Sequence, residues 1–208
     1  MLFTQNAVFL HVPKTGGSWV RDALLAAGIP RDEYLVDGDQ HADLSYCPHP
    51  ERFKFAFVRH PLSLYRSYWR YKMGTYGTSD WDVRNPFDVD CAATTFDAFV
   101  RNVLAKYPGW CTQMFEDYTG PLHGQIEFVG RFERLADELV VALRLAGETF
   151  DETLLRQTPR TNVSWWPAQE AQWSAELASA VLAAEWAAIV RFGYDRTLRA
   201  AGDLRCCR

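Results

Sequence analysis

The stretch that decides the fold is 7-AVFLHVPKTGGS-18. Its first half, residues 7–12, is a compact apolar run and predicts a buried strand. Residues 13–17 have the composition of a turn, and residues 18–27 carry apolar side chains at helical spacing until Gly28. A strand, a glycine-containing loop and a helix in this order indicate an α/β domain.

The same alternation of strands and helices continues along the chain. Strands are expected over residues 7–12, 34–36, 53–58 and 126–129. Helices are expected over residues 18–27, 62–71, 96–105, 134–146 and 174–191. Residues 74–91 read as a long loop, and residues 156–167 as irregular. We therefore predict a single α/β domain over residues 1–208, with a central, mainly parallel sheet flanked by helices.

Composition and charge limit the classes of partner. The 208 residues include 22 Lys and Arg against 26 Asp and Glu, a formal net charge of −4. This balance argues against binding nucleic acid or an anionic membrane through bulk charge. No apolar run approaches the roughly 20 residues of a membrane span, and the five cysteines show no CxxC or zinc-ligand spacing. We therefore expect a cytoplasmic protein with free thiols, no metal site and no membrane span.

The loop after the first strand has the features of a phosphate cradle. Gly16 and Gly17 let backbone amides approach a ligand closely, and the following helix offers N–H groups at its amino terminus. Thr15 and Ser18 add hydroxyl groups, and Lys14 adds a mobile cation. This is not a Walker A loop, because the lysine precedes the glycines instead of following them. The alternative is a tight turn whose lysine is merely solvated.

A second cluster follows the strand expected over residues 53–58. Arg59 stands at the carboxyl end of this strand, where parallel sheets bind ligands, and arginine is a bidentate donor for phosphate. Ser67 lies about two turns into the next helix. By itself, Arg59 is equally compatible with an ion pair to an acidic side chain. Together with the preceding loop, it suggests a nucleotide that carries phosphates at two separated positions.

Both clusters resemble those of the sulfotransferases that use 3'-phosphoadenosine 5'-phosphosulfate. Residues 13–18 look like that family's 5'-phosphosulfate loop. Residues 57–69, FVRHPLSLYRSYW, look like its 3'-phosphate motif, in which a serine follows an arginine by eight residues. His60 departs from the Asn or Asp that many relatives carry, but the phosphate role belongs to Arg59.

Three further segments resemble the family less specifically. Residues 128–133, FVGRFE, are similar to a late strand segment of the bacterial and carbohydrate-type members. Residues 160–164, RTNVS, are placed like the late loop that closes over the donor, and residues 192–195 resemble the usual end of the domain. The matches span residues 7–195 in the family's order. They imply a P-loop-NTPase-like three-layer sandwich.

The resemblance implies in-line transfer of a sulfuryl group from this donor to an acceptor hydroxyl or amine. Lys14 would stabilise the leaving phosphate, and the backbone amides of residues 15–18 would hold the 5' side. Arg59 and Ser67 would hold the 3'-phosphate. The expected donor-binding residues are Lys14, Thr15, Gly16, Gly17, Ser18, Trp19, Arg59, Ser67, Arg160, Asn162 and Ser164.

His41 is the expected base for the acceptor proton. The unperturbed pKa of histidine suits catalysis at neutral pH, and relatives often place a base histidine between the two phosphate motifs. His11 lies within the first predicted strand and is expected to be structural. The alternative bases are His49, Asp37, Asp39 and Glu33.

The acceptor is expected to be a small molecule or a saccharide, with peptide tyrosine left open. Loop 74–95 and segment 108–124 are expected to shape its site. Exposed aromatic residues in the stretch from Tyr65 to Trp81, together with Trp165 and Trp166, are candidate stacking surfaces for the acceptor. Core packing is the competing explanation for these aromatics. Two other functions remain open. One is a nucleotide or small-molecule kinase, which would need Mg²⁺ ligands, and the other is a non-catalytic nucleotide-binding module.

Overall fold

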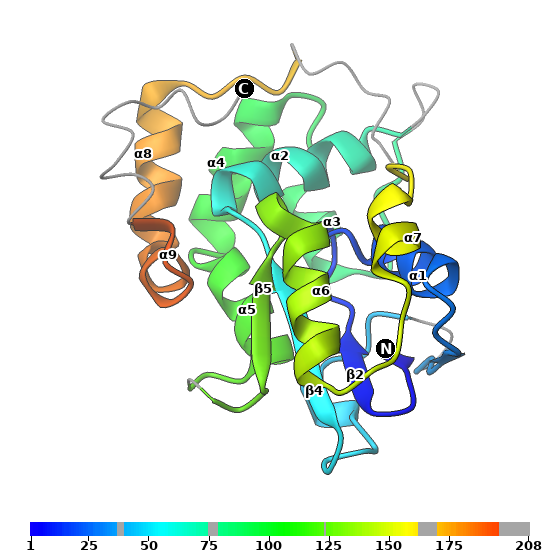
Figure 1. Ribbon diagram of the computed structural model, residues 1–208. Helices are drawn as coiled ribbons and strands as arrows, with labels where there is room; N and C mark the ends of the chain where they lie inside the picture. Colours follow the sequence, from blue (N-terminus) through cyan, green and yellow to red (C-terminus); the bar gives the residue numbers. More distant parts are fainter. Residues whose placement is uncertain (37–39, 75–78, 123, 162–169, 196–208) are drawn as a thin grey trace. The chain divides into compact units, whose positions relative to one another are not determined.

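The chain folds into two compact units, seen in the computed structural model of Figure 1. The structure describes residues 1–36, 40–74, 79–122, 124–161 and 170–195. The first unit comprises residues 1–59 and 114–163, and the second comprises residues 60–113 and 164–208. All strands of the described chain belong to the first unit.

The first unit is an α/β fold with a five-stranded mixed sheet packed against helices. Its strands follow the order β3 (Asp32–Glu33), β1 (Leu2–Phe3), β2 (Ala7–Leu10), β4 (Phe53–Val58) and β5 (Phe128–Arg131). β2, β4 and β5 run parallel, whereas β1 pairs antiparallel with both β2 and β3. The α/β class is therefore confirmed. The sheet is mixed because β1, a strand that the sequence pattern does not predict, pairs antiparallel with its two neighbours. The strand expected over residues 34–36 lies earlier, at β3.

Three helices pack on one face of this sheet: α1 (Gly17–Ala26), α6 (Leu135–Leu145) and α7 (Glu152–Gln157) (Figure 1). Alternate residues of β2 and β4 point to this face, because side chains alternate along a strand. The shared core includes Ala7, Phe9, Phe55, Phe57, Val20, Leu24, Leu139, Leu143 and Leu155. Burying one aliphatic or aromatic side chain contributes about 1.5–3 kcal/mol, so this core holds α1 against β2.

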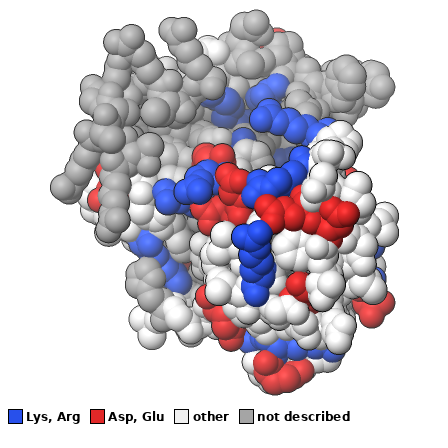
Figure 2. Space-filling model, viewed as in Figure 1, with Lys and Arg blue, Asp and Glu red and all other residues white. Residues whose placement is uncertain are grey.

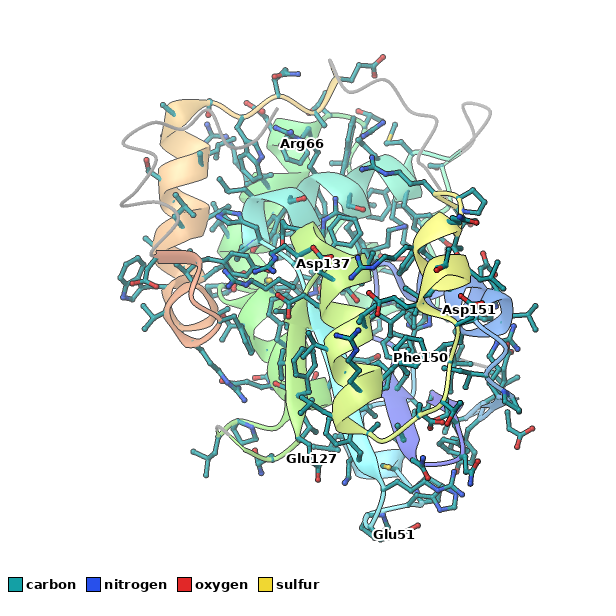
Figure 3. The ribbon with its side chains drawn as sticks, in the orientation of Figure 1. Glu51, Arg66, Glu127, Asp137, Phe150 and Asp151 are labelled. Atoms are coloured by element: carbon teal, nitrogen blue, oxygen red, sulfur yellow. The ribbon has the colours of Figure 1, made fainter. Side chains whose placement is uncertain are left out.

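The register of the parallel strands brings their carboxyl ends to one edge of the sheet. Val58 and Arg131, the last residues of β4 and β5, are paired, and Ala56 of β4 pairs with the last residue of β2. At the opposite edge, the Glu127 carboxylate accepts a hydrogen bond from the Lys54 backbone N–H and lies 3.6 Å from the Lys54 ammonium (Figure 3). The segments that follow the three parallel strands therefore emerge side by side.

The second unit is built from helices in the part of it that the structure describes. They are α2 (Pro61–Lys72), α3 (Pro86–Cys91), α4 (Phe96–Lys106), the start of α5 (Trp110–Thr119), α8 (Ala175–Ala184) and α9 (Trp186–Arg191). α4 packs against α2 and α8. The aromatic core between them includes Tyr65, Trp69, Phe96, Phe99 and Trp173.

Two predictions for this unit, one of a loop and one of a helix, are wrong. Residues 74–91 are not one long loop, because the Asn85 side chain caps α3 by accepting a hydrogen bond from the Phe87 N–H. Residues 174–191 are not one helix, because Glu185 leaves helical geometry, at φ −100° and ψ 16°, and separates α8 from α9. Helices α5 and α7 also form where the sequence pattern predicts no element.

No helix among the described residues is long and apolar enough to cross a membrane. Of the five cysteines, Cys47, Cys91 and Cys111 are described, and all three are free thiols. Burial raises the pKa of the Cys91 thiol to about 11 and that of the Cys111 thiol well above its usual range. These two thiols therefore stay protonated, and so unreactive, at neutral pH. Cys206 and Cys207 lie outside the described residues.

Candidate functional site

The loop of residues 13–18, the glycine loop, has an alternating backbone conformation. Lys14 and Gly16 have left-handed φ angles of 62° and 91°, whereas Thr15 between them does not. Alternation of this kind forms backbone nests, in which successive N–H groups converge on an anion. The left-handed conformation costs a non-glycine residue about 1 kcal/mol or more, so the surroundings must hold Lys14 there.

Packing around the glycine loop leaves no room for larger residues at its glycines. α1 begins at Gly17, where a β-carbon would lie 1.9 Å from Nε2 of His11. A β-carbon on Gly16 would lie 2.6 Å from the nearest side-chain atom of α6. Thr15 is fully buried, and its hydroxyl donates to the Val12 carbonyl at 2.9 Å. Close approach therefore requires both glycines, and the Thr15 hydroxyl serves the loop itself.

Arg59 lies beside the glycine loop. It directly follows β4, and its Nη1 donates a hydrogen bond to the Lys14 carbonyl at 3.1 Å. Its guanidinium carbon lies 4.0 Å from the centroid of the Phe132 ring. The hydrogen bond holds the peptide that follows the left-handed Lys14. The structure thus brings into contact two elements that the sequence predicts to bind phosphate.

His41 is tied to the end of β2. Its Nδ1 lies 2.8 Å from the His11 carbonyl oxygen, and the centroids of the two rings are 4.3 Å apart. Because a carbonyl oxygen can only accept, Nδ1 carries the proton, and a neutral His41 has its lone pair on Nε2. The Tyr118 hydroxyl donates to the His41 carbonyl. These bonds fix His41 at the strand end that leads into Lys14.

His11 is buried and stays neutral. Burial is the main cause that lowers its pKa to about 2, and the charges of His41, Arg21 and Lys14 act in the same direction. The residue is 6% exposed, and its ring stacks on Phe9. These contacts favour the structural role that the sequence predicts for His11.

Further donor-binding residues expected from the sequence lie on α1 and beyond α7. Ser18 is in the first turn of α1. Trp19 donates its indole N–H to the Thr158 carbonyl at 3.2 Å, which ties α1 to the segment that leads to Arg160. Arg160 is exposed. The first turn of α1 and this late segment are therefore held close together.

The remaining expected residues belong to other parts of the chain. Ser67 lies on α2, in the second unit. Among the alternative bases, Nδ1 of His49 lies 3.3 Å from the Glu51 carboxylate, and Glu33 lies 3.8 Å from Arg21. The expected residues outside the described part of the chain are Asn162, Ser164, Trp165, Trp166, Asp37 and Asp39.

Part of the loop expected to shape the acceptor site is anchored inside the second unit. The fully buried Asp88 carboxylate accepts hydrogen bonds from the Tyr68 hydroxyl at 2.6 Å and the Asp82 backbone N–H at 2.9 Å. It also pairs with the Lys72 ammonium, which donates to the Asp80 carbonyl at 3.1 Å. This cluster fixes the loop against α2.

Several aromatic residues proposed for acceptor stacking serve the core of the second unit instead. Tyr65 and Trp69 are almost fully buried. Trp81 packs against Phe99, with 5.9 Å between the ring centroids. Tyr71 is 45% exposed. Core packing therefore accounts for these side chains, apart from Tyr71.

Charged side chains of both signs are interspersed on the face shown in Figure 2. Arg156 lies 2.7 Å from Asp137 and 2.8 Å from Glu152, and Arg144 also pairs with Glu152. Figure 3 shows Asp137 on α6, and Asp151 at the start of α7. Such exposed pairs contribute about 0–1 kcal/mol each. Each of these two arginines therefore has an acidic partner on α6 or α7.

Two residues of this region have no role predicted from the sequence. Phe132 stacks with Arg59, and Tyr118 holds the carbonyl of His41. Neither side chain belongs to the types that a phosphate motif requires. An aromatic residue one position beyond the strand paired with β4 is the signal that identifies Phe132.

No protein-family model, curated protein or solved structure matches the chain. In the described ranges, no group of three or more His, Cys, Asp or Glu side chains is placed to hold a metal ion. The geometry of the glycine loop, Arg59 and His41, together with the sequence motifs, is therefore the basis for assigning a function.

Proposed function

We propose that the chain is a sulfotransferase that uses 3'-phosphoadenosine 5'-phosphosulfate as its donor. The observation that carries this proposal is the contact between Arg59 and the glycine loop, in which Nη1 donates to the Lys14 carbonyl at 3.1 Å. Two phosphate-type elements at neighbouring strand ends suit a nucleotide with phosphates at two positions. The order of the motifs, from residues 13–18 to residues 57–69, supports the same donor.

The glycine loop would hold the 5' side of the donor. The backbone N–H groups of residues 15–18 lie at the amino terminus of α1, where the helix dipole favours an anion. The Lys14 ammonium would neutralise the charge that develops on the leaving phosphate oxygen. Because the Thr15 hydroxyl donates to Val12, we assign the part of Thr15 to its backbone N–H.

Arg59 would hold the 3' side of the donor. Its guanidinium offers a planar pair of N–H groups that matches a phosphate. The family resemblance adds further proposed contacts, from Trp19, Ser67, Arg160, Asn162 and Ser164. The glycine loop and Arg59 would therefore fix the donor at both of its phosphate groups.

His41 would act as the base. Its Nδ1 proton is donated to the His11 carbonyl, so Nε2 is the atom that accepts the proton of the acceptor hydroxyl or amine. As the acceptor atom forms its bond to sulfur, the bond between sulfur and the leaving phosphate oxygen breaks. The proton ends on His41, and Lys14 balances the negative charge left on the phosphate.

The proposal extends to the finer fold and to the partners. The order of strand, glycine loop and helix supports a P-loop-NTPase-like three-layer sandwich with a central sheet. The acceptor would be a small molecule or a saccharide, because a net charge of −4 disfavours a long sulfated polymer or a nucleic acid. The proposed location is the cytoplasm.

Nucleotide titration followed by a transfer assay tests this function. We expect the chain to bind adenosine 3',5'-bisphosphate more tightly than ATP, and to transfer sulfate to a member of an acceptor panel. Tighter binding of ATP would indicate a kinase. Binding of the bisphosphate without transfer to any acceptor would indicate a non-catalytic nucleotide-binding module.

Lys14→Ala tests the mechanism. We expect kcat to fall by about 10²- to 10³-fold, as when a group that stabilises transition-state charge is removed. The free energy of unfolding should change by less than about 0.5 kcal/mol, since Lys14 is partly exposed. Lys106→Ala removes another partly exposed lysine, with 47% of its side chain accessible, and should keep wild-type turnover. Wild-type kcat in Lys14→Ala would contradict the mechanism.

A further inference from the structure

The register of the sheet places Phe132 beside Arg59. Val58 and Arg131 are the last residues of β4 and β5 and are paired, so the next residue of each strand emerges at the same edge. Those next residues are Arg59 and Phe132, and the guanidinium carbon lies 4.0 Å from the ring centroid, over the ring. The π electrons of the ring attract a cation held at this distance.

The same ring also contacts the glycine loop. A β-carbon on Gly16 would lie 3.1 Å from Cδ2 and 3.2 Å from Cε2 of Phe132. Gly16 is the left-handed residue at the amino-terminal cap of α1. The ring therefore packs against the turn that sets the direction of the loop N–H groups. Phe132 touches both elements that would bind the donor phosphates.

The contact with the ring restrains Arg59, while its guanidinium still donates a hydrogen bond. A guanidinium on an aromatic ring contacts it through its flat face, whereas its N–H groups point outward in their own plane. One of these groups, Nη1, donates to the Lys14 carbonyl. An arginine that is already ordered loses less rotamer entropy when it binds an anion. The stack therefore favours phosphate binding beyond the effect of charge alone.

We propose that Phe132 is a positioning residue that holds Arg59 in the geometry in which it binds the donor's 3'-phosphate. This inference rests on the proposed function, since it concerns recognition of the same donor. The ring itself transfers no proton and acts through Arg59.

Two nucleotides that differ by the 3'-phosphate test this role by calorimetry. Phe132→Leu should weaken binding of adenosine 3',5'-bisphosphate about tenfold, and binding of adenosine 5'-monophosphate by less than about threefold. Phe132→Tyr keeps the ring and should stay within about threefold of wild type for both. Phe3→Leu is the matched control, because it removes another Phe–Arg contact of the first unit, with Arg52 at 6.0 Å, and should leave both affinities unchanged.

A double-mutant cycle tests whether Phe132 acts through Arg59. In an Arg59→Ala background, Phe132→Leu should change the affinity for the bisphosphate less than about twofold, because no cation remains over the ring. A further tenfold loss in that background would overturn the positioning role. Equal losses for both nucleotides in the single variant Phe132→Leu would overturn it too, since they would show a general structural effect.

A spectroscopic readout keeps this inference separable from the proposed function. The ring current of Phe132 should shift the Nε–H resonance of Arg59 upfield in wild type and in Phe132→Tyr, and the shift should vanish in Phe132→Leu. A wild-type chain that binds neither nucleotide would contradict the proposed function. Loss of the shift in Phe132→Leu without loss of affinity for the bisphosphate would contradict the positioning role alone.

Discussion

In the second unit, the fully buried carboxylate of Glu185 accepts hydrogen bonds from Tyr65 and from the first turn of α5. In the first unit, Arg59 and Lys14 are partly exposed cations, and the Arg59 guanidinium donates a hydrogen bond to the carbonyl of Lys14, which has a left-handed backbone. The carboxylate is surrounded by donors, as buried polar groups in folded proteins generally are. The cations combine backbone strain with charge at the surface, a combination that clusters at functional sites.

The difference suggests how the two regions respond to substitution. A satisfied, buried charge such as Glu185 contributes to the free energy of unfolding, because its removal would take the acceptor away from several buried donors. A strained, partly exposed cation such as Lys14 contributes little to stability, and its proposed part is in the chemistry. Substitutions near the glycine loop should therefore lower activity at nearly constant stability, and substitutions at Glu185 should do the reverse.

The largest effect on activity is expected from His41→Ala. Removing a general base typically lowers kcat by about 10²- to 10⁴-fold. The free energy of unfolding should fall by only about 1 kcal/mol, through loss of the hydrogen bond to the His11 carbonyl. Steady-state sulfate transfer and urea unfolding measure the two quantities. If kcat fell less than about threefold, the base would have to be another residue, and His49→Ala would be assayed next.

Glu185→Ala tests the opposite side of the comparison. Its Oε1 accepts from the Tyr65 hydroxyl at 2.7 Å and the Cys111 N–H at 3.0 Å, and its Oε2 accepts from the N–H and the hydroxyl of Thr112, both at 2.8 Å. A buried donor left without an acceptor costs about 1–3 kcal/mol. We expect the free energy of unfolding to fall by about 3–4 kcal/mol, measured by urea denaturation.

Glu176→Ala is the matched control on α8. Its carboxylate lies 3.3 Å from Arg101, and its side chain is 74% exposed, so the free energy of unfolding should change by less than about 0.5 kcal/mol. Similar small losses in both variants would show that the Glu185 cluster does not stabilise the second unit. A fall in kcat per folded molecule of Glu185→Ala would break the comparison, because it would connect the cluster to the chemistry.

The strands and helices near the glycine loop are predictable because several local signals agree. Residues 7–27 combine an apolar run, turn residues and helical spacing, and β2 and α1 form where this pattern places them. β1 and β3 have two residues each, too few to show a period, and they form through pairing with each other and with β2. Short strands of this kind depend on partners that a local pattern does not contain.

The candidate site is predictable where the chemistry stands at a strand end. The sequence predicts Arg59 because it directly follows an apolar strand, where parallel sheets bind ligands, and because the preceding loop has the features of a phosphate cradle. Glu185 lies in an alanine-rich helical run, and its role depends on Tyr65 and Thr112, which are 120 and 73 residues away. Phe132 likewise depends on the pairing of β4 with β5. These roles arise from tertiary contacts, so they can be recognised only once the partner elements are known.

The smallest effect concerns His11 and the pH dependence of stability. Burial lowers the pKa of His11 from 6.5 to about 2. Below pH 6.5 the unfolded chain therefore binds a proton that the folded chain does not. The contribution of neutral His11 is complete above about pH 6.5 and is lost as the pH falls. At pH 5 the loss is about 2 kcal/mol, because one pKa unit corresponds to about 1.4 kcal/mol.

His11→Phe keeps an aromatic ring against Phe9 and removes the titrating group. The difference in unfolding free energy between pH 7 and pH 5, measured with urea, should be about 2 kcal/mol smaller in this variant than in wild type. An unchanged difference would mean that His11 is protonated in the folded chain. The charged His11 ring would then lie against Gly17, close to the charge of Lys14. The predicted result instead separates the two histidines at the end of β2. His11 belongs with the buried groups that hold the fold, whereas His41 is the histidine proposed for the chemistry.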